Sequence, residues 1–257
     1  MILLNPKGKV NLHTHTAYCD GNDTPEALVK KAIELGMEAI GFSGHEHSYF
    51  DESYCMSIAD TEKYRSEILE LREKYKGKIK IYLGIERDYF GEGSDYPYDY
   101  VIGSLHCVLK DGEYLYVDYT EEILVDAVNK HFDGDYMALV KCYYDTIVDV
   151  VEKTGADIIG HFDQLTKFNE GNKYFDEESA EYKEIAISAL RKVAAHRPIF
   201  EINTGAMAKG YRTSPFPSRF LVDEIIRLGC PIILSSDCHS AEKLLYKFDE
   251  IKEQLGD

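Results

Sequence analysis

Residues 9–15 read Lys-Val-Asn-Leu-His-Thr-His, a strand-like run that ends in two histidines. We expect a strand over Lys9–His13, an amphipathic helix over Thr24–Leu35 and a second strand over Ala39–Ser43. Gly36 suits the end of the helix, because glycine readily adopts the left-handed conformation found there. A strand, a helix and a strand in this order predict a βαβ unit with parallel strands.

The same alternation continues to the end of the chain. The further expected strands are Ile79–Ile85, Tyr100–Leu105, Asp157–Gly160, Ile199–Asn203 and Pro231–Ser235. The further expected helices are Thr61–Tyr75, Tyr136–Lys153, Glu177–Ala195, Ser218–Leu228 and Ala241–Gln254. Repeated right-handed crossovers close into a barrel or wind into an open sheet. No linker or internal repeat interrupts the pattern, so we expect one α/β domain over residues 1–257.

One region departs from this rhythm, between Val108 and Asp135. Residues 110–113 read Lys-Asp-Gly-Glu and predict a turn, and a short helix is expected around Glu121–Lys130. The region follows the fourth expected strand. Loops in this position of an α/β barrel shape the choice of substrate.

Composition narrows the class of protein. The chain has 257 residues and a net charge of −17, which disfavours binding to a nucleic-acid backbone. No apolar stretch reaches about 18 residues and Met1–Lys7 does not resemble a signal peptide, so we expect a cytoplasmic protein without membrane contact. None of the six cysteines forms a C-x-x-C pair. We expect them, including Cys19, Cys107 and Cys238, to be packed thiols and not metal ligands.

Six of the nine histidines lie at or just past the ends of expected strands, and acidic residues occupy similar positions. The candidate metal ligands are His13, His15, Asp20, His45, Glu86, His106, His161, Asp237 and His239. The carboxyl ends of barrel strands converge on one face, so these side chains are expected to share a small volume. Imidazoles and carboxylates suit zinc, iron or manganese, and nine ligands suffice for two or three ions. We expect His47, His131 and His196 to be structural.

Short motifs in the chain resemble those of one known family. They are Asn11-Leu12-His13-Thr14-His15-Thr16, Cys19-Asp20-Gly21, Gly44-His45, Gly84-Ile85-Glu86, Gly103-Ser104-Leu105-His106, Gly160-His161 and Ser236-Asp237-Cys238-His239. In this order they resemble the polymerase-and-histidinol-phosphatase (PHP) family over nearly the whole chain. The resemblance implies a distorted (β/α)7 TIM-like barrel with a trinuclear metal site. Gly44 stands where the family usually has aspartate, a residue that is not among the candidate ligands.

The resemblance also implies how the ligands are shared among three ions, with Glu86 as a bridge between two of them. The three sets are His13, His15, Glu86 and Asp237; Glu86, His106 and His161; and Asp20, His45 and His239. The implied reaction is hydrolysis of a small phosphomonoester by a metal-bridging hydroxide. The stand-alone members that the chain resembles most hydrolyse L-histidinol phosphate in histidine biosynthesis.

Basic residues can neutralise the phosphate. We expect Glu86, Asp237 and Arg212 to be the catalytic residues, with Arg212 on the phosphate because its planar guanidinium suits that group. Lys209 and Lys167 are further candidates for binding the phosphate.

The alcohol half of the substrate needs other contacts. Asp118, Tyr116 or Tyr119, after the predicted turn, are candidates to bind the amine and imidazole of histidinol. Other functions remain open: a related phosphatase for a nucleoside monophosphate or a phosphotyrosyl protein, an amidohydrolase, or a non-catalytic metal-binding regulator. Amidohydrolases typically place a lysine at a middle strand end, and none occurs at that position here. The sequence does not define an oligomeric state.

Overall fold

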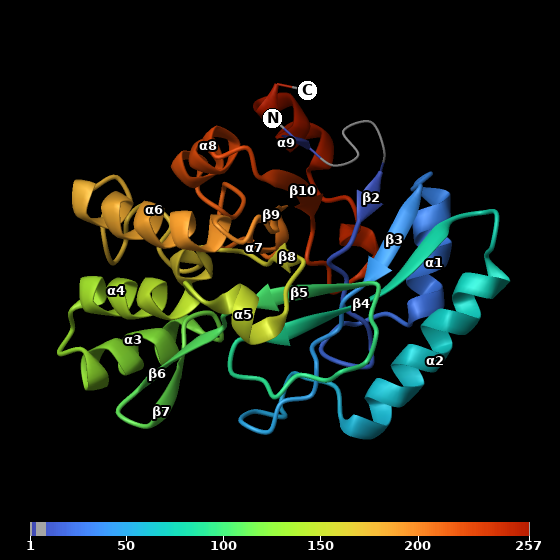
Figure 1. Ribbon diagram of the computed structural model, residues 1–257, viewed down its shortest axis with the longest axis horizontal. Helices are drawn as coiled ribbons and strands as arrows, with labels where there is room; N and C mark the ends of the chain where they lie inside the picture. The colour runs from blue at the N-terminus through green and yellow to red at the C-terminus, as the bar shows by residue number, and fades with distance from the viewer. Residues whose placement is uncertain (1, 4–8, 257) are drawn as a thin grey trace.

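Parallel strands arranged in a nearly closed barrel form the centre of the computed structural model, which describes residues 2–3 and 9–256 (Figure 1). The barrel strands are β2 (Val10–Asn11), β3 (Ala39–Phe42), β4 (Lys80–Asp88), β5 (Tyr100–Ser104), β8 (Ile158–Ile159), β9 (Ile199–Asn203) and β10 (Pro231–Ser235). The short β1 (Ile2–Leu3) pairs with β10, which gives the order β1-β10-β9-β8-β5-β4-β3-β2. A parallel bridge between Thr14 and Cys238 brings the two edges together, so the predicted distorted (β/α)7 barrel is confirmed.

The strands are buried on both faces, as parallel strands between a core and outer helices must be. All four residues of β3 are buried. Inside the barrel, Tyr100 crosses neighbouring strands, and its hydroxyl donates to the backbone carbonyls of Leu12 and Phe42. Gly84 leaves room for this ring, because a Cβ atom at that position would lie 2.2 Å from Cζ of Tyr100. The position therefore requires glycine for a close approach.

Helices surround the barrel (Figure 1). They are α1 (Pro25–Glu34), α2 (Ile58–Lys74), α3 (Glu121–His131), α4 (Tyr136–Ile147), α5 (Val150–Thr154), α6 (Ala180–Ala194), α7 (Gly205–Ala208), α8 (Arg219–Arg227) and α9 (Phe248–Leu255), with 3-10 turns at Gln164–Thr166 and Ala241–Lys243. The sequence explains their starts: at α1 the Thr24 hydroxyl accepts a hydrogen bond from the backbone N–H of Ala27. The buried faces of α1 and α2 pack with β3 and β4, and those of α4, α6 and α8 pack with β8, β9 and β10.

Two expected helices are divided in the structure. The segment expected as Tyr136–Lys153 forms α4 and α5, because the backbone at Asp149 leaves the helical conformation. The segment expected as Ala241–Gln254 forms a 3-10 turn and α9, separated by Lys247 in a left-handed conformation with φ of 57°. A residue in that conformation ends a right-handed helix.

The region after β5 forms a β-hairpin whose strands the sequence did not predict. Strand β6 (Cys107–Lys110) pairs antiparallel with β7 (Glu113–Tyr116). The expected turn is confirmed at Asp111-Gly112, where both residues have positive φ, as a two-residue hairpin loop requires. Helix α3 follows, so the predicted short helix is also confirmed.

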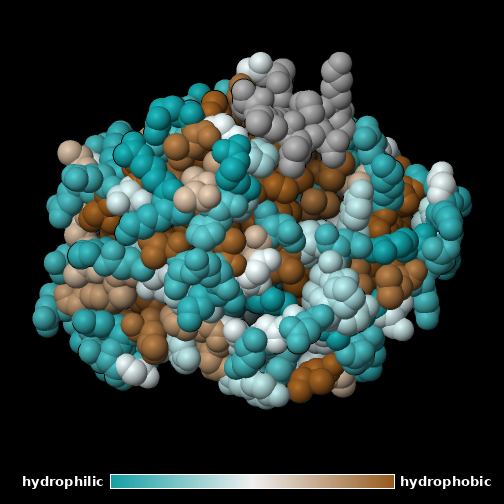
Figure 2. All heavy atoms as spheres, in the orientation of Figure 1, coloured by the Kyte–Doolittle hydropathy of each residue, from teal (hydrophilic) through white to brown (hydrophobic). Residues whose placement is uncertain are grey.

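Hydrophilic side chains cover much of the face shown in Figure 2, and hydrophobic side chains lie between them. Among the described residues, no helix combines the length and apolar composition needed to cross a bilayer. Most of the Met1–Lys7 segment, on which the signal-peptide prediction depended, lies outside the described residues.

Candidate metal centre

The structure brings all nine candidate ligands together at the carboxyl ends of the barrel strands. They fall into four overlapping groups: His15, Asp20, His45 and His239; His13, Glu86 and His161; His13, His15 and Asp237; and His45, Glu86 and His106. In each group, one ligand atom from every member lies within 4.8 Å of the others. No cysteine of the described residues joins these groups.

Local backbone geometry directs the first two histidines to one side. His13 and His15 follow β2 in an extended segment, so their side chains share a face while Thr14 points away. The segment is fixed to the chain after β10, because the His15 N–H donates to the Cys238 carbonyl at 2.9 Å. Asp237 precedes that contact and therefore faces the same volume.

His13 and His15 each face both Glu86 and Asp237 at the bottom of the site. Nε2 of His13 and Nε2 of His15 lie 3.2 and 3.4 Å from Oε2 of Glu86. The same nitrogens lie 3.6 and 3.1 Å from Oδ1 of Asp237. Ligands about 2.1 Å from a tetrahedral zinc ion are separated by about 3.4 Å. These separations are close to that value, and His13, His15 and Asp237 form one of the four ligand groups.

Unpaired polar atoms support the same conclusion. Nε2 of His13, Nε2 of His15 and Oε2 of Glu86 are buried and have no hydrogen-bond partner among the described residues. Leaving a buried polar group unpaired costs about 1–3 kcal/mol. An ion bound by all three atoms would remove this cost, so the donor set fits a metal.

The other oxygen of Glu86 faces a second pair of histidines. Oε1 lies 3.1 Å from Nε2 of His161 and 3.5 Å from Nε2 of His106. It also accepts a hydrogen bond from the Ser104 hydroxyl at 2.6 Å, which fixes the orientation of the carboxylate. Glu86 can therefore bridge two ions.

The third candidate group lies nearer the surface. Oδ2 of Asp20 lies 3.0 Å from Nε2 of His239, and Oδ1 lies 3.8 Å from Nε2 of His45. The same Oδ1 is 3.4 Å from Nδ1 of His15, and Nδ1 of His45 is 3.1 Å from Oε2 of Glu86. These contacts overlap, so the distances do not divide the ligands into the three separate sets that the resemblance implies.

Hydrogen bonds behind the histidines fix their tautomers. Nδ1 of His13 lies 2.9 Å from Oε2 of Glu201, and Nδ1 of His106 lies 2.9 Å from Oδ2 of Asp88. In each ring an acceptor holds the Nδ1 proton, which leaves the Nε2 lone pair facing the site. The sequence analysis assigned no role to Glu201 or Asp88. Asp88 could have been found, because it follows Glu86 by two positions on a strand and therefore shares its face.

We expect Glu201→Gln to weaken metal binding by about 10- to 100-fold, as changes in such supporting contacts typically do. Glu201 also accepts hydrogen bonds from the His161 N–H and the Asn203 amide through its other oxygen, so glutamine can accept on one side only and places an N–H against donors on the other. Competition with a chromogenic chelator measures the affinity. The exposed Glu34→Gln variant is the control, and an affinity equal to that of the wild type would contradict the assigned role.

Charges in the site keep the carboxylates ionised. Burial alone would raise the pKa of Glu86, but His13, His45 and a hydrogen bond from His106 hold it well below its usual range. Burial opposes ionisation of Asp237 in the same way, and His13, His15 and Lys209 hold its pKa well below its usual range. Ionised carboxylates are the form that binds divalent cations.

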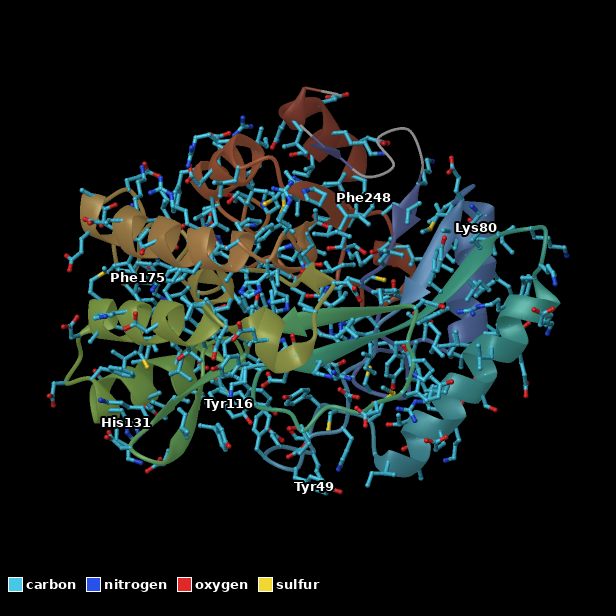
Figure 3. The ribbon with its side chains drawn as sticks, viewed as in Figure 1. Tyr49, Lys80, Tyr116, His131, Phe175 and Phe248 are labelled. Carbon is cyan, nitrogen blue, oxygen red and sulfur yellow. The ribbon has the colours of Figure 1, made fainter. Side chains whose placement is uncertain are left out.

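A cavity of about 230 Å³ opens above these ligands. It is lined by Asp20, His45, Tyr54, Glu86, His106, Tyr116, Asp118, Tyr119, His161, Gln164, Lys167, Lys209, Asp237 and His239. Lys209, Asp118 and Tyr116, the expected substrate-binding residues, therefore all face it. Figure 3 labels Tyr116, on the hairpin side of the site. Tyr54 and Gln164 also line the cavity, and the sequence analysis did not single them out.

Arg212 does not line the cavity. Its Nη1 donates to Oε1 of Glu177 at 2.6 Å and to the Thr166 carbonyl at 2.8 Å, and its Nη2 donates to Oε2 of Glu177 at 3.0 Å. The guanidinium is thus already bound by a buried carboxylate. Its position does not support the expected contact with phosphate, and Lys167 and Lys209 are the basic residues that line the cavity.

The three histidines expected to be structural lie outside the cavity lining. His47 contacts the Met56 carbonyl through Nδ1 at 3.1 Å. His131 lies beside Asp111 at the hairpin turn, and His196 lies 3.9 Å from Glu152.

Comparison with known proteins gives consistent results. The model of the PHP domain family matches residues 11–205. A histidinol-phosphatase from Bacillus subtilis is 26% identical, over 94% of this chain and 97% of its own length. A histidinol-phosphatase from Lactococcus lactis is 28% identical, over 91% of this chain and 86% of its own length.

Solved structures share the fold. The structure of a Listeria monocytogenes protein has a TM-score of 0.79 at 22% identity and covers 94% of this chain and 99% of its own. A second structure is that of histidinol phosphate phosphatase from Lactococcus lactis, complexed with Zn, L-histidinol and phosphate. It has a TM-score of 0.69 at 24% identity and covers 97% of this chain and 94% of its own.

Proposed function

The chain belongs to the PHP domain family, and on this basis we propose that it is a metal-dependent phosphatase that converts L-histidinol phosphate to L-histidinol and phosphate. The observation that carries the proposal is the set of buried, unpaired atoms of His13, His15 and Glu86 beneath a small cavity. Two relatives named histidinol-phosphatase match at least 91% of the chain. The reaction belongs to histidine biosynthesis, and we assign it to the cytoplasm and to one domain over residues 1–257.

We propose that the nine ligands bind two or three divalent ions, with zinc as the first candidate and iron or manganese as alternatives. Zinc is present in the solved phosphatase from Lactococcus lactis. Divalent ions bound here supply an acidified water and a positive centre that compensates charge on the phosphate. Glu86 and Asp237 would hold the ions, and the two oxygens of Glu86 face different histidines.

Two lysines are positioned to bind the phosphate. Lys209 lines the cavity and interacts electrostatically with Asp237. Lys167 lines the same cavity, and its ammonium group donates to the Asp118 carbonyl at 2.5 Å. Both lysines therefore lie beside the ligands, where a phosphate oxygen would need a positive partner. As point charges they tolerate several orientations of the phosphate.

The alcohol half of the substrate faces the hairpin side of the cavity. Tyr116, Asp118 and Tyr119 line this side. Oδ2 of Asp118 accepts a hydrogen bond from Nε2 of Gln164 at 2.8 Å, which fixes the carboxylate. An ionised carboxylate and phenol hydroxyls suit the amine and imidazole of histidinol.

Phosphate release from L-histidinol phosphate tests the proposal, measured beside AMP and a phosphotyrosine peptide, with and without a chelator. We expect strong preference for L-histidinol phosphate, loss of activity with the chelator and recovery after zinc is added back. Preferential turnover of AMP or the peptide would support phosphatase activity but reject L-histidinol phosphate as the substrate. No turnover of any ester with metal present would reject the phosphatase.

A further inference from the structure

Tyr54 lies in the segment between β3 and α2 and lines the cavity. Its ring packs edge-to-face on His45, with 4.9 Å between ring centroids, and lies 6.2 Å from the ring of His106. The hydroxyl is buried and has no hydrogen-bond partner among the described residues. Buried hydroxyls are normally paired, so this one is available to a molecule in the cavity.

The segment that carries Tyr54 is attached to the β6–β7 hairpin. The Tyr116 hydroxyl donates a hydrogen bond to the carboxylate of Asp51. The Phe50 ring packs on Tyr114 with 4.7 Å between centroids. These two contacts join the segment to the hairpin that forms one wall of the cavity, so Tyr54 is held in place over the ligands.

Gly44 explains how this segment folds back over His45. A Cβ atom at Gly44 would lie 3.3 Å from both Sγ of Cys19 and Cε of Met56, closer than most real contacts. Met56 is fully buried, and its N–H donates to the His45 carbonyl at 3.1 Å. The missing side chain at position 44 therefore leaves the space that Met56 fills. Met56 in turn closes the base of the segment and places Tyr54 above His45.

Acidic and hydroxyl side chains share the hairpin side of the cavity with Tyr54. Tyr116, Asp118 and Tyr119 line this side, and Tyr116 contacts the segment that carries Tyr54. Lys167 donates to the backbone carbonyl of Asp118, and Lys209 interacts electrostatically with Asp237 at the ligand cluster. The carboxylate of Asp118 on the hairpin side of the cavity suits a protonated nitrogen.

We propose that Tyr54 determines specificity by binding the protonated nitrogen of the alcohol half of the substrate through its hydroxyl oxygen. The inference rests on the proposed function and extends it, because it names a residue that distinguishes cationic phosphomonoesters from uncharged ones. The phosphate lies at the ligand cluster and the lysines, and the nitrogen group lies beneath Tyr54.

The test compares Tyr54→Phe with the wild type and with Tyr49→Phe, the same change at an exposed tyrosine in the same segment, labelled at the periphery in Figure 3. Isothermal calorimetry measures binding of L-histidinol and of inorganic phosphate to the zinc-loaded proteins. We expect Tyr54→Phe to weaken L-histidinol binding about tenfold or more, as loss of a hydrogen bond to a charged group does. Phosphate binding and zinc content stay unchanged, and Tyr49→Phe matches the wild type.

Hydrolysis gives a second readout. With p-nitrophenyl phosphate, which lacks a cationic group, Tyr54→Phe retains the wild-type kcat/KM, whereas KM for L-histidinol phosphate rises by a factor similar to the change in L-histidinol affinity. Equal losses on both esters, weaker phosphate binding, or unchanged L-histidinol binding would each overturn the role of Tyr54. Failure of the proposed function can be distinguished from failure of the Tyr54 role. In that case the wild-type protein itself would not hydrolyse L-histidinol phosphate.

Discussion

Replacing Glu86 with glutamine is expected to lower kcat/KM for the phosphoester by about a thousandfold or more and to remove at least one bound ion. Metal ions contribute several kcal/mol of transition-state stabilisation, and each 1.36 kcal/mol corresponds to a tenfold change in rate. Glu86 is 1% exposed and lies at the middle of the cluster. Its two oxygens face different histidines, so one substitution affects two ion positions.

The reason lies in the direction of the hydrogen bonds. Glutamine keeps the shape of Glu86 but places an N–H donor where the carboxylate faced Nε2 of His13 and Nε2 of His15. Because Glu201 holds the opposite nitrogen of the His13 ring, the Nε2 lone pair would accept from the new amide instead of binding an ion. The substitution therefore removes the Glu86 carboxylate as a ligand, and the new amide also occupies the Nε2 lone pair of His13.

Metal content measured by inductively coupled plasma mass spectrometry, together with steady-state rates on L-histidinol phosphate, checks this expectation. Glu73→Gln makes the same change at an exposed position of α2 and should leave both quantities unchanged. Glu86→Gln protein with full metal content and normal activity would show that Glu86 does not bridge ions.

The positions of the candidate ligands were predictable because they depend on local rules. A strand ends where its apolar run ends, and the ends of parallel barrel strands meet on one face. His45 follows β3 and His161 follows β8, and the structure brings both beside Glu86, as expected. Asp20 lies in the loop between β2 and α1, and the structure brings it beside His239.

The remaining features depend on how distant segments pack. Glu201 supports His13 only because the register of the barrel places β9 behind the segment after β2. Tyr54 reaches the cavity because Met56 fills the space beside Gly44. Neither relation appears as spacing in the sequence. Arg212 has the chemistry of a phosphate ligand, but its neighbour in space is a glutamate 35 positions earlier in the chain.

Arg212→Ala is expected to lower the free energy of unfolding by about 3–5 kcal/mol, the usual effect of removing one partner from a buried ion pair. The side chains of Arg212 and Glu177 are only 6% and 11% exposed. Without the guanidinium, the buried Glu177 carboxylate loses its charged partner, and the Thr166 carbonyl loses a donor. The ion pair also joins the loop that carries Lys167 to the loop that carries Lys209.

Urea unfolding at a fixed zinc concentration measures this effect, because bound metal also contributes to stability. Arg219→Ala is the matched control: its ion pair with Asp223 is exposed, so we expect a change of at most about 1 kcal/mol. The double variant Arg212→Ala with Glu177→Ala should lose less free energy of unfolding than the sum of the two single variants, since it leaves neither charge of the pair unpaired. A phosphate-binding arginine would behave differently. Its removal would raise KM or lower kcat/KM while stability stayed within about 0.5 kcal/mol of the wild type, as surface changes do.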